Sequence, residues 1–275
     1  MGATVETTEH GEGRQPLALW WRSRYGLRLL LEVGLVGGLL LTYMRVRQFT
    51  RGDLRAAFQN TREVIQFERW IGLPFEDDLQ RALLNHPELV RFLNHYYLWF
   101  HFPVAIGLLA WLYWRHNDHY FYIRRLMAVV TFLALVIHVA YPLAPPRMMP
   151  GFVDTMFRYG PSIYTRNTLE GAANQIAAMP SLHFGWAVIA AMAVVQVNRS
   201  RWRYVAVLHP FLMGTAIVAT ANHWWVDAAA AGLIIFFCWA AAKLVSRLLA
   251  AREQDWEESA YTPVSAQPSS TNVRC

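Results

Sequence analysis

Three short segments carry residues whose types and spacing are suited to chemistry. They are YPLAPPRMMP (141–150), MPSLHFG (179–185) and NHWWVD (222–227). In the third segment, His223 and Asp227 are four residues apart, so they can face one another on a helix or a tight turn. A carboxylate bonded to the far nitrogen of an imidazole fixes its tautomer and favours the positive charge that develops on the ring.

These residue types suit the transfer of a phosphoryl group. An imidazole such as His223 can attack phosphorus and form a covalent intermediate. A second imidazole, His183, can protonate the departing oxygen as a general acid. The guanidinium of Arg147 can hold the negative charge of the phosphate. Ser181 and the amides at the beginning of the following apolar run form an anion site if that run is a helix.

The elements that must position these segments are long apolar runs. Hydrophobic residues make up 55% of the 275 residues and charged residues only 16%, against roughly a quarter charged in ordinary globular domains. A helix needs about 20 apolar residues to cross ~30 Å of hydrocarbon. Six runs approach or reach this length: 25–44, 93–114, 126–143, 182–197, 205–220 and 225–249. An up-and-down path through them brings the three segments to one membrane face.

The sequence therefore predicts an all-α, polytopic membrane protein with a bundle of six transmembrane helices. We expect a polar cytoplasmic segment at 1–24, a membrane domain at 25–249 and a disordered tail at 250–275. Within the membrane domain, residues 45–92 are predicted to form amphipathic helices that lie on the bilayer, from the spacing of Val64, Phe67 and Ile71. Two roles remain open for 45–92: a cap that packs over the bundle, and substrate capture.

The distribution of arginine predicts the orientation. Arginines lie near the ends of the apolar runs rather than in one stripe, which argues against a nucleic-acid partner despite the net charge of +6. Short loops rich in arginine face the cytoplasm. Placing 115–125 and 199–203 there puts both termini in the cytoplasm and the three segments outside, in a plasma-membrane protein. Cys238 and Cys275 are not expected to form a disulfide or a zinc site.

The three segments together resemble a known family. MPSLHFGWA, NHWWVDAAAAG and the upstream PPRMMP are similar to the type 2 phosphatidic acid phosphatase superfamily. More narrowly, they resemble its inositol phosphorylceramide synthase branch, where PSLH-x-G and NH-x-x-x-D are typical. The resemblance implies a six-helix bundle without metal or other cofactor. It also implies roles for individual residues: His223 as nucleophile, Asp227 as its orienting partner, His183 as acid/base, and Arg147, Ser181 and the backbone near Gly185 as phosphate ligands.

The sequence departs from the pattern of the broad family at four positions. Where the first family motif has Lys and Pro this chain has Ala140 and Met148, and where the third has Ser and Arg it has Ala216 and Ile217. We expect Arg158 or Arg166 to replace the missing cations, and Arg166→Ala to reduce turnover sharply. Arg166 and Asn222 are therefore counted with Arg147, Ser181 and Gly185 as predicted substrate-binding residues. The departures suit the transferase-like branch.

The resulting hypothesis is an integral membrane phosphatase or phosphotransferase with a phosphohistidine intermediate. Its substrate is a phospholipid, polyprenyl or sphingolipid phosphate, or a phosphodiester. Water or an alcohol such as inositol completes the second step, so hydrolase and transferase remain open. One alternative is a metal-dependent hydrolase with His183, His223 and Asp227 as ligands. Another is a non-catalytic transporter or lipid-binding protein in which these groups form a polar site.

Other polar and aromatic residues in the apolar runs have structural interpretations. Intramembrane histidines and asparagines often form hydrogen bonds inside a bundle, and tryptophans often anchor a helix at the membrane interface. The first interpretation applies to Asn94, His95, His101, His138 and His209, and the second to Trp224 and Trp225. The alternative for Asn94, His95 and His101 is that they line the pocket.

Overall fold

The computed structural model describes residues 28–38, 41–42, 45, 53–161 and 176–261. The chain divides into two compact units, 1–49 and 50–275. In the first unit the described residues are helical, but they cover only part of the predicted run 25–44. In the second unit the regular structure of the described residues is helical, apart from an isolated bridge between Leu143 and Ala177. The all-α prediction is confirmed for these residues.

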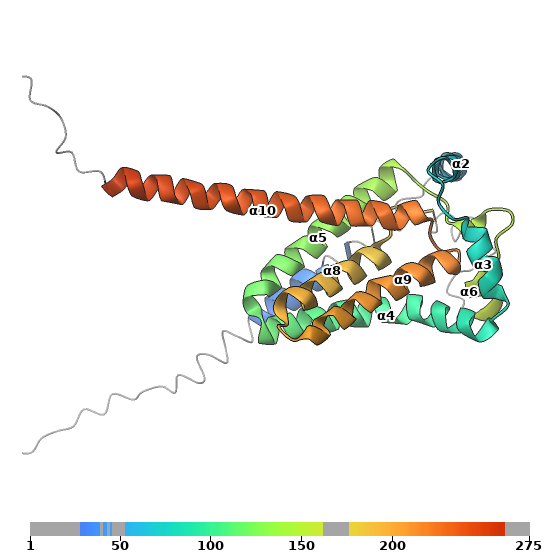
Figure 1. The fold of residues 1–275 in the computed structure, drawn as a ribbon, viewed down its shortest axis with the longest axis horizontal. Coiled ribbons are helices and arrows are strands. Elements are labelled where there is room, and N and C mark those ends of the chain that lie inside the picture. Colours follow the sequence, from blue (N-terminus) through green and yellow to red (C-terminus); the bar gives the residue numbers. More distant parts are fainter. Residues whose placement is uncertain (1–27, 39–40, 43–44, 46–52, 162–175, 262–275) are drawn as a thin grey trace, which may run out of the picture. The chain divides into compact units, whose positions relative to one another are not determined.

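The described residues of the second unit form ten helical segments, and the α-helices among them are labelled in Figure 1. They are α2 (Leu54–Trp70), α3 (Glu76–Leu84), α4 (Pro87–Arg115), α5 (Asn117–Ala140), η1 (Pro146–Met148), α6 (Thr155–Tyr159), α8 (Leu182–Val197), η2 (Arg201–Val207), α9 (Leu208–Ala219) and α10 (Trp225–Tyr261).

Four helical stretches of the described chain are long and apolar enough to cross a membrane, which indicates an integral membrane protein. They are Pro87–Arg115, Asn117–Ala140, Arg201–Ala219 and Trp225–Gln254. The predicted number of six is not confirmed. Run 25–44 is described only in part, and α8, with 16 residues, is shorter than a typical span.

Helix α8 is the central helix of the second unit. It contacts α4, α5, α9 and α10, and its buried residues include Gly185, Ala187, Ala190 and Ala193. A helix that is apolar on every side is expected in the core of a bundle. Small side chains let its neighbours approach closely, so α8 holds its first turn at a fixed place among the other helices.

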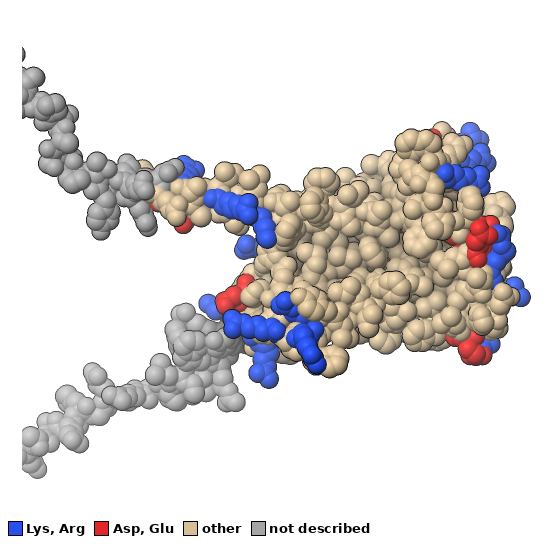
Figure 2. Space-filling view, in the orientation of Figure 1, with Lys and Arg blue, Asp and Glu red and all other residues tan. Residues whose placement is uncertain are grey.

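The chain path brings the ends of several helices together. The C-terminal end of α5, the start of α8 and the junction between α9 and α10 lie at the end of the bundle that α2 and α3 cover (Figure 1). The opposite end carries the turns after α4 and α8, with exposed Arg115, Arg199 and Arg201. On the face shown in Figure 2, charged residues gather at these two ends and a broad uncharged belt lies between them.

Helix α2 packs on the loops that precede α8 and follow α5. Its buried residues Ala57, Thr61, Val64 and Glu68 recur at the helical period on one face. The Thr61 hydroxyl donates to the Ala144 carbonyl at 3.1 Å and accepts from the Ala144 amide at 3.0 Å. These contacts are the kind expected of a cap on this end of the bundle.

The other face of α2 leaves apolar side chains uncovered. Phe67, Trp70 and Ile71 are 48%, 81% and 45% exposed. This face suits contact with lipid, and the interfacial position predicted from Val64, Phe67 and Ile71 stays a prediction.

Helix α3 is tied to the chain between η1 and α6. The buried Gln80 amide donates to the Val153 carbonyl at 2.9 Å and accepts from the Val153 amide at 2.8 Å. Asn94 of α4 likewise donates to the carbonyls of Thr155 and Gly160. These bonds fix α6 and the loop before it against α3 and α4.

The last helix is longer than the sequence predicted. Helix α10 continues to Tyr261, whereas the tail was expected to begin at residue 250. The apolar run ends near 249, but Ala250, Ala251 and the following Arg and Glu residues are good helix formers. Adding such residues to an existing helix has a small free-energy cost, because the helix is already nucleated. The rest of the predicted tail, 262–275, lies outside the described residues.

Candidate active site

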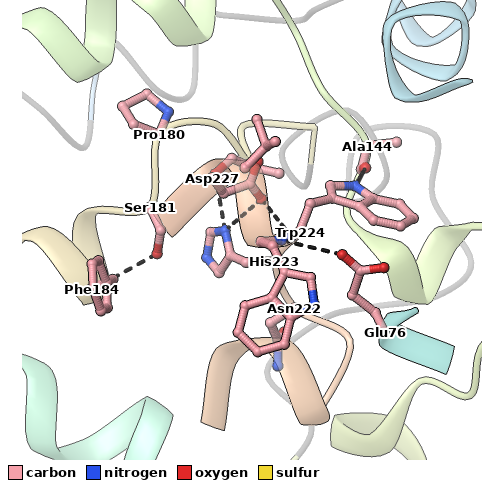
Figure 3. Close-up of polar contacts among 12 residues, drawn as sticks. Glu76, Ala144, Pro180, Ser181, Phe184, Asn222, His223, Trp224 and Asp227 are labelled. Atoms are coloured by element: carbon pink, nitrogen blue, oxygen red, sulfur yellow. Dashed lines mark hydrogen bonds and ion pairs between the residues drawn. The ribbon is translucent and has the colours of Figure 1, made fainter. Parts of the chain in front are cut away.

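His223 and Asp227 form a hydrogen-bonded dyad at the start of α10 (Figure 3). The His223 Nδ1 atom lies 3.1 Å from Asp227 Oδ2 and 2.9 Å from the carbonyl oxygen of Ala178. A backbone carbonyl can only accept a hydrogen bond. Nδ1 therefore carries the hydrogen, and the lone pair of the neutral ring lies on Nε2. Both side chains are buried, with Asp227 fully enclosed.

The backbone between α9 and α10 places the dyad. Helix α9 ends at Ala219, and Ala221 follows in the left-handed region with φ 59°, which is uncommon for a residue other than glycine. The amides of Asn222 and His223 both donate to the carbonyl of Ile217, at 2.9 and 3.0 Å. This tight turn reverses the chain, so that His223 faces the beginning of α8.

His183 lies in the first turn of α8. Ser181 caps this helix, since its side chain accepts from the Phe184 amide, and the Ser181 amide donates to the Asp227 carbonyl at 3.0 Å. The cap bond is the local reason why the helix begins here. The bond to Asp227 joins the start of α8 to the start of α10. This backbone hydrogen bond fixes the segment that carries His183 against the segment that carries His223.

The two histidine rings lie close together and contact aromatic side chains of α4. The centroids of His183 and His223 are 6.2 Å apart. Tyr97 of α4 stacks on His183 with centroids 4.1 Å apart and meets His223 edge-on at 6.4 Å. His101, one turn further along α4, lies 4.3 Å from His183. His183, His223 and the two rings of α4 therefore form one cluster.

Arg147 lies in η1 and is joined to the same turn. Its guanidinium donates to Asn222 Oδ1 at 2.7 Å, and its amide donates to the Ala221 carbonyl at 2.9 Å. The Asn222 side chain also donates to the Thr220 hydroxyl at 2.7 Å and is buried. Asn222, predicted to bind substrate, therefore orients Arg147 through its side chain. The structure thus brings together five predicted site residues: Arg147, His183, Asn222, His223 and Asp227.

The remaining predicted residues have different positions. The Ser181 hydroxyl is buried at the α8 cap. The Gly185 amide donates to the Ser181 carbonyl at 2.9 Å, and a Cβ atom at Gly185 would face Ala231 and Ile235 of α10. Arg158 is exposed on α6, with its guanidinium over the Tyr159 ring. Arg166 lies outside the described residues.

The positions that depart from the broad family's third motif are packed in the core. Ala216 and Ile217 are both fully buried in α9, where their neighbours include Met213 and Ala187. The second half of the chain thus combines a complete His-x-x-x-Asp motif with apolar core residues in the preceding helix.

A protein-family model matches more than half of the chain. Residues 62–242 match the model of the PAP2 superfamily, and this range includes every residue of the site described above.

The chain belongs to the PAP2 superfamily.

Members of the PAP2 superfamily are typically phosphatases, which supports an enzyme acting on a phosphate ester. No curated protein and no solved structure matches this chain. The described part of the chain contains no group of three or more His, Cys, Asp or Glu residues that could hold a metal ion.

Two rings of α4 belong to this cluster. Tyr97 was not singled out from the sequence, and for His101 hydrogen bonding inside the bundle was preferred to a place in the pocket, whereas both rings contact His183. Their spacing of four residues places them on one helical face, and this was the available signal. Asn94 does form the predicted internal bonds, and His138 and His209 are hydrogen bonded to Pro180 and Tyr96. His95 is exposed and bonds only to its own helix, at the Arg91 carbonyl.

The interpretation of Trp224 as an interfacial anchor is wrong. Trp224 is 1% exposed, and its indole donates to the Ala144 carbonyl at 2.9 Å. The adjacent Trp225 is partly buried and donates to the Pro74 carbonyl at 2.9 Å. Two neighbouring tryptophans point in different directions at a helix start, and composition alone does not distinguish the one that enters the core.

Proposed function

We propose that this chain is a membrane enzyme that removes or transfers the phosphoryl group of a lipid phosphate or phosphodiester through a phosphohistidine at His223. The observation that carries the proposal is the tautomer of His223. Ala178 and Asp227 hold the hydrogen on Nδ1, which leaves Nε2 as the nucleophile. His183 lies at a distance suited to the opposite side of the reacting phosphorus.

The first step forms one bond and breaks another. His223 Nε2 attacks phosphorus, a P–N bond forms, and the bond from phosphorus to the leaving oxygen breaks. This oxygen belongs to the lipid in a phosphomonoester and to the head-group alcohol in a phosphodiester that exchanges its head group. His183 gives its proton to that oxygen. The Asp227 carboxylate stabilises the positive charge that His223 gains. In the second step an oxygen nucleophile loses a proton to His183 and attacks phosphorus, and the P–N bond breaks.

Arg147 supplies the fixed positive charge of the site. Its guanidinium is oriented by Asn222 at 2.7 Å, and a fork of donors is well suited to the oxygens of a phosphate. The placement of this site at one end of an apolar bundle (Figures 1 and 2) supports a substrate whose chain remains in the bilayer. A phospholipid, polyprenyl or sphingolipid phosphate has this form.

Transfer to a polyol is the second candidate, and the buried Ala216 and Ile217 favour it. These apolar residues occupy the positions of the broad family's Ser and Arg. A site with fewer cations suits a phosphodiester, which carries one negative charge less than a monoester, and inositol would then take the place of water in the second step.

The test is an assay of the purified protein with a panel of phosphorylated lipids, with and without inositol. Phosphate release indicates hydrolysis, and head-group exchange that requires inositol indicates transfer. We expect His223→Gln to lower turnover on the order of 10³-fold or more, since it removes the nucleophile. A labelled phosphoenzyme that is stable to base and labile to acid should form with the natural chain and not with the variant.

His95→Gln is the matched control, because His95 is an exposed histidine outside the site. Full activity of His223→Gln would contradict the proposal. Activity that persists in excess EDTA would reject the metal-dependent alternative, and uptake of lipid into liposomes without turnover would favour transport.

A further inference from the structure

The first turn of α10 is held by three carboxyl groups from three different helices. The Trp224 amide donates to Asp227 Oδ2 at 2.9 Å, the Trp225 amide to Glu76 Oε1 at 3.2 Å, and the Val226 amide to Glu68 Oε1 at 2.8 Å. Figure 3 shows Glu76 beside this turn. The first amides of a helix lack partners within the helix, and a residue just before it usually supplies one. Here α3 and α2 supply two.

Glu68 and Glu76 are buried together. They are 4% and 5% exposed, and two ionised carboxylates in such surroundings repel each other and lose their hydration. Burial, the hydrogen bond to Glu76 and the negative charge of Glu76 raise the pKa of Glu68 to about 9, and Asp227 of α10 adds to the rise. As a carboxylate, Glu68 would leave its Oε2 without a hydrogen-bond donor. A proton on Glu68 lets the two carboxyl groups bond to each other.

We propose that Glu68 and Glu76 are positioning residues, which share one proton and hold the first turn of α10 so that His223 and Asp227 stay aligned with His183. This inference rests on the proposed function for its catalytic part. Neither glutamate contacts the histidine rings in the described contacts. They act through the amides of Trp225 and Val226, which lie between the two members of the dyad.

The contacts explain why small shifts of this turn matter. Asp227 Oδ2 accepts from both the Trp224 amide and the His223 ring, and the Asp227 carbonyl accepts from Ser181. A movement of the first turn therefore moves the carboxylate, the nucleophile and the start of α8 together. Misplacement of reacting groups by about 1 Å can lower a rate 10²-fold.

The shared proton also gives the pair a dependence on pH. The pKa of Glu68 in the folded protein, about 9, is above its ordinary value of 4.5. Protonated Glu68 therefore stabilises the fold fully when the pH is below its ordinary pKa. This stabilisation declines as the pH rises toward the pKa of Glu68 in the folded protein. Loss of the proton would place a second negative charge beside Glu76 and Asp227. Both the stability of the fold and the alignment of the dyad are then expected to decrease at alkaline pH.

The experiment compares the natural protein with Glu68→Gln and Glu68→Ala between pH 6 and 9.5. A glutamine keeps an oxygen for the Val226 amide and donates its NH₂ group to Glu76 without titrating. We expect the unfolding equilibrium constant of the natural protein to rise with pH, by up to about tenfold per unit for one proton. In the Glu68→Gln protein, this rise of the unfolding equilibrium constant with pH should be absent, and so should the matching decrease of kcat at alkaline pH.

Glu68→Ala removes the acceptor of the Val226 amide. We expect hydrogen exchange of the Trp225 and Val226 amides to accelerate at least about tenfold, and kcat to fall up to ~10²-fold with little change of KM. Asp78→Asn, an exposed carboxyl on α3, is the matched control and should leave all three measurements unchanged. Glu76→Gln, which leaves the same single negative charge on the pair from the other side, should reproduce Glu68→Gln.

Two results would overturn the inference. One is a Glu68→Gln protein that keeps the alkaline loss of stability and kcat of the natural protein. The other is a Glu68→Ala protein whose Trp225 and Val226 amides exchange at the natural rate. Stability and exchange are measured without substrate, so a failure of the proposed function would be seen separately, as absence of turnover in the natural protein at every pH.

Discussion

His223 illustrates how a single ring is prepared by its surroundings. One nitrogen is surrounded by two acceptors, a carboxylate and a carbonyl, within 3.1 Å. The sequence predicted the carboxylate, since a separation of four residues is a local relation that a helical turn satisfies. It did not predict the carbonyl of Ala178, which is 45 residues away along the chain. Such a contact depends on how α8 and α10 pack.

Arg147 should be sensitive to replacement by lysine. Lys keeps the positive charge but not the planar fork of donors that binds Asn222 and is proposed to bind phosphate. A charged hydrogen bond contributes about 1.5–3 kcal/mol, so we expect kcat/KM to fall about 10- to 100-fold in Arg147→Lys.

The measurement is a comparison of kcat and KM on the preferred lipid, with Arg62→Lys as control, because Arg62 is exposed on α2. Equal kinetics for Arg147→Lys and the natural protein would show that this guanidinium does not hold the substrate.

At the scale of helices, the sequence predicted some boundaries closely. The run 182–197 coincides with α8, because Ser181 is a good helix cap and the following residues are apolar. The run 93–114 was too short, since α4 begins at Pro87. Proline at the first helical position and the acidic Glu88 are favourable there, but hydropathy does not detect a polar first turn.

Long-range hydrogen bonds of buried polar side chains could not be predicted from periodicity. Gln80 occurs in an amphipathic helix, as the sequence suggested, but its pairing with the Val153 backbone joins residues 73 positions apart. Thr61 and Trp224 make comparable bonds to Ala144. Together these bonds fix the loops that carry Arg147, and they depend on the complete fold.

Gln80→Leu should destabilise the protein without touching the dyad. The substitution removes both partners of the Val153 backbone and leaves buried polar groups, at about 1–3 kcal/mol each. We expect the free energy of unfolding in detergent to fall by about 2–6 kcal/mol for the two groups together.

Gln59→Leu is the matched control, because Gln59 is exposed on α2 and its replacement should change stability by less than about 0.5 kcal/mol. A Gln80→Leu protein as stable as the control would show that the contact to Val153 does not stabilise the attachment of α3.

At the scale of the whole molecule, the exposed arginines after α4 and α8 lie at the end of the bundle opposite the dyad. With this basic end in the cytoplasm, the proposed active site faces outward. Single cysteines in a chain with Cys238 and Cys275 replaced by serine test this. We expect a membrane-impermeant maleimide to label Asp78→Cys in intact cells and Arg201→Cys only after permeabilisation.

The reverse pattern of labelling would place the site in the cytoplasm. Labelling of both positions in intact cells would contradict a membrane-spanning arrangement of the helices between them.

The bridge between Leu143 and Ala177 has a consequence for how such a protein can diversify. The Leu143 amide donates to the Ile176 carbonyl at 2.9 Å, and the Ala178 amide donates to the Leu143 carbonyl at 3.2 Å. These bonds clamp together the two ends of the chain segment that leaves after α5 and returns before α8. Ala178 belongs to this clamp and its carbonyl accepts from the His223 ring, and Arg147 follows Leu143 by four residues. A substitution that displaced the clamp would therefore move both groups at once, so diversification of the chain is expected to spare Leu143 and Ala178.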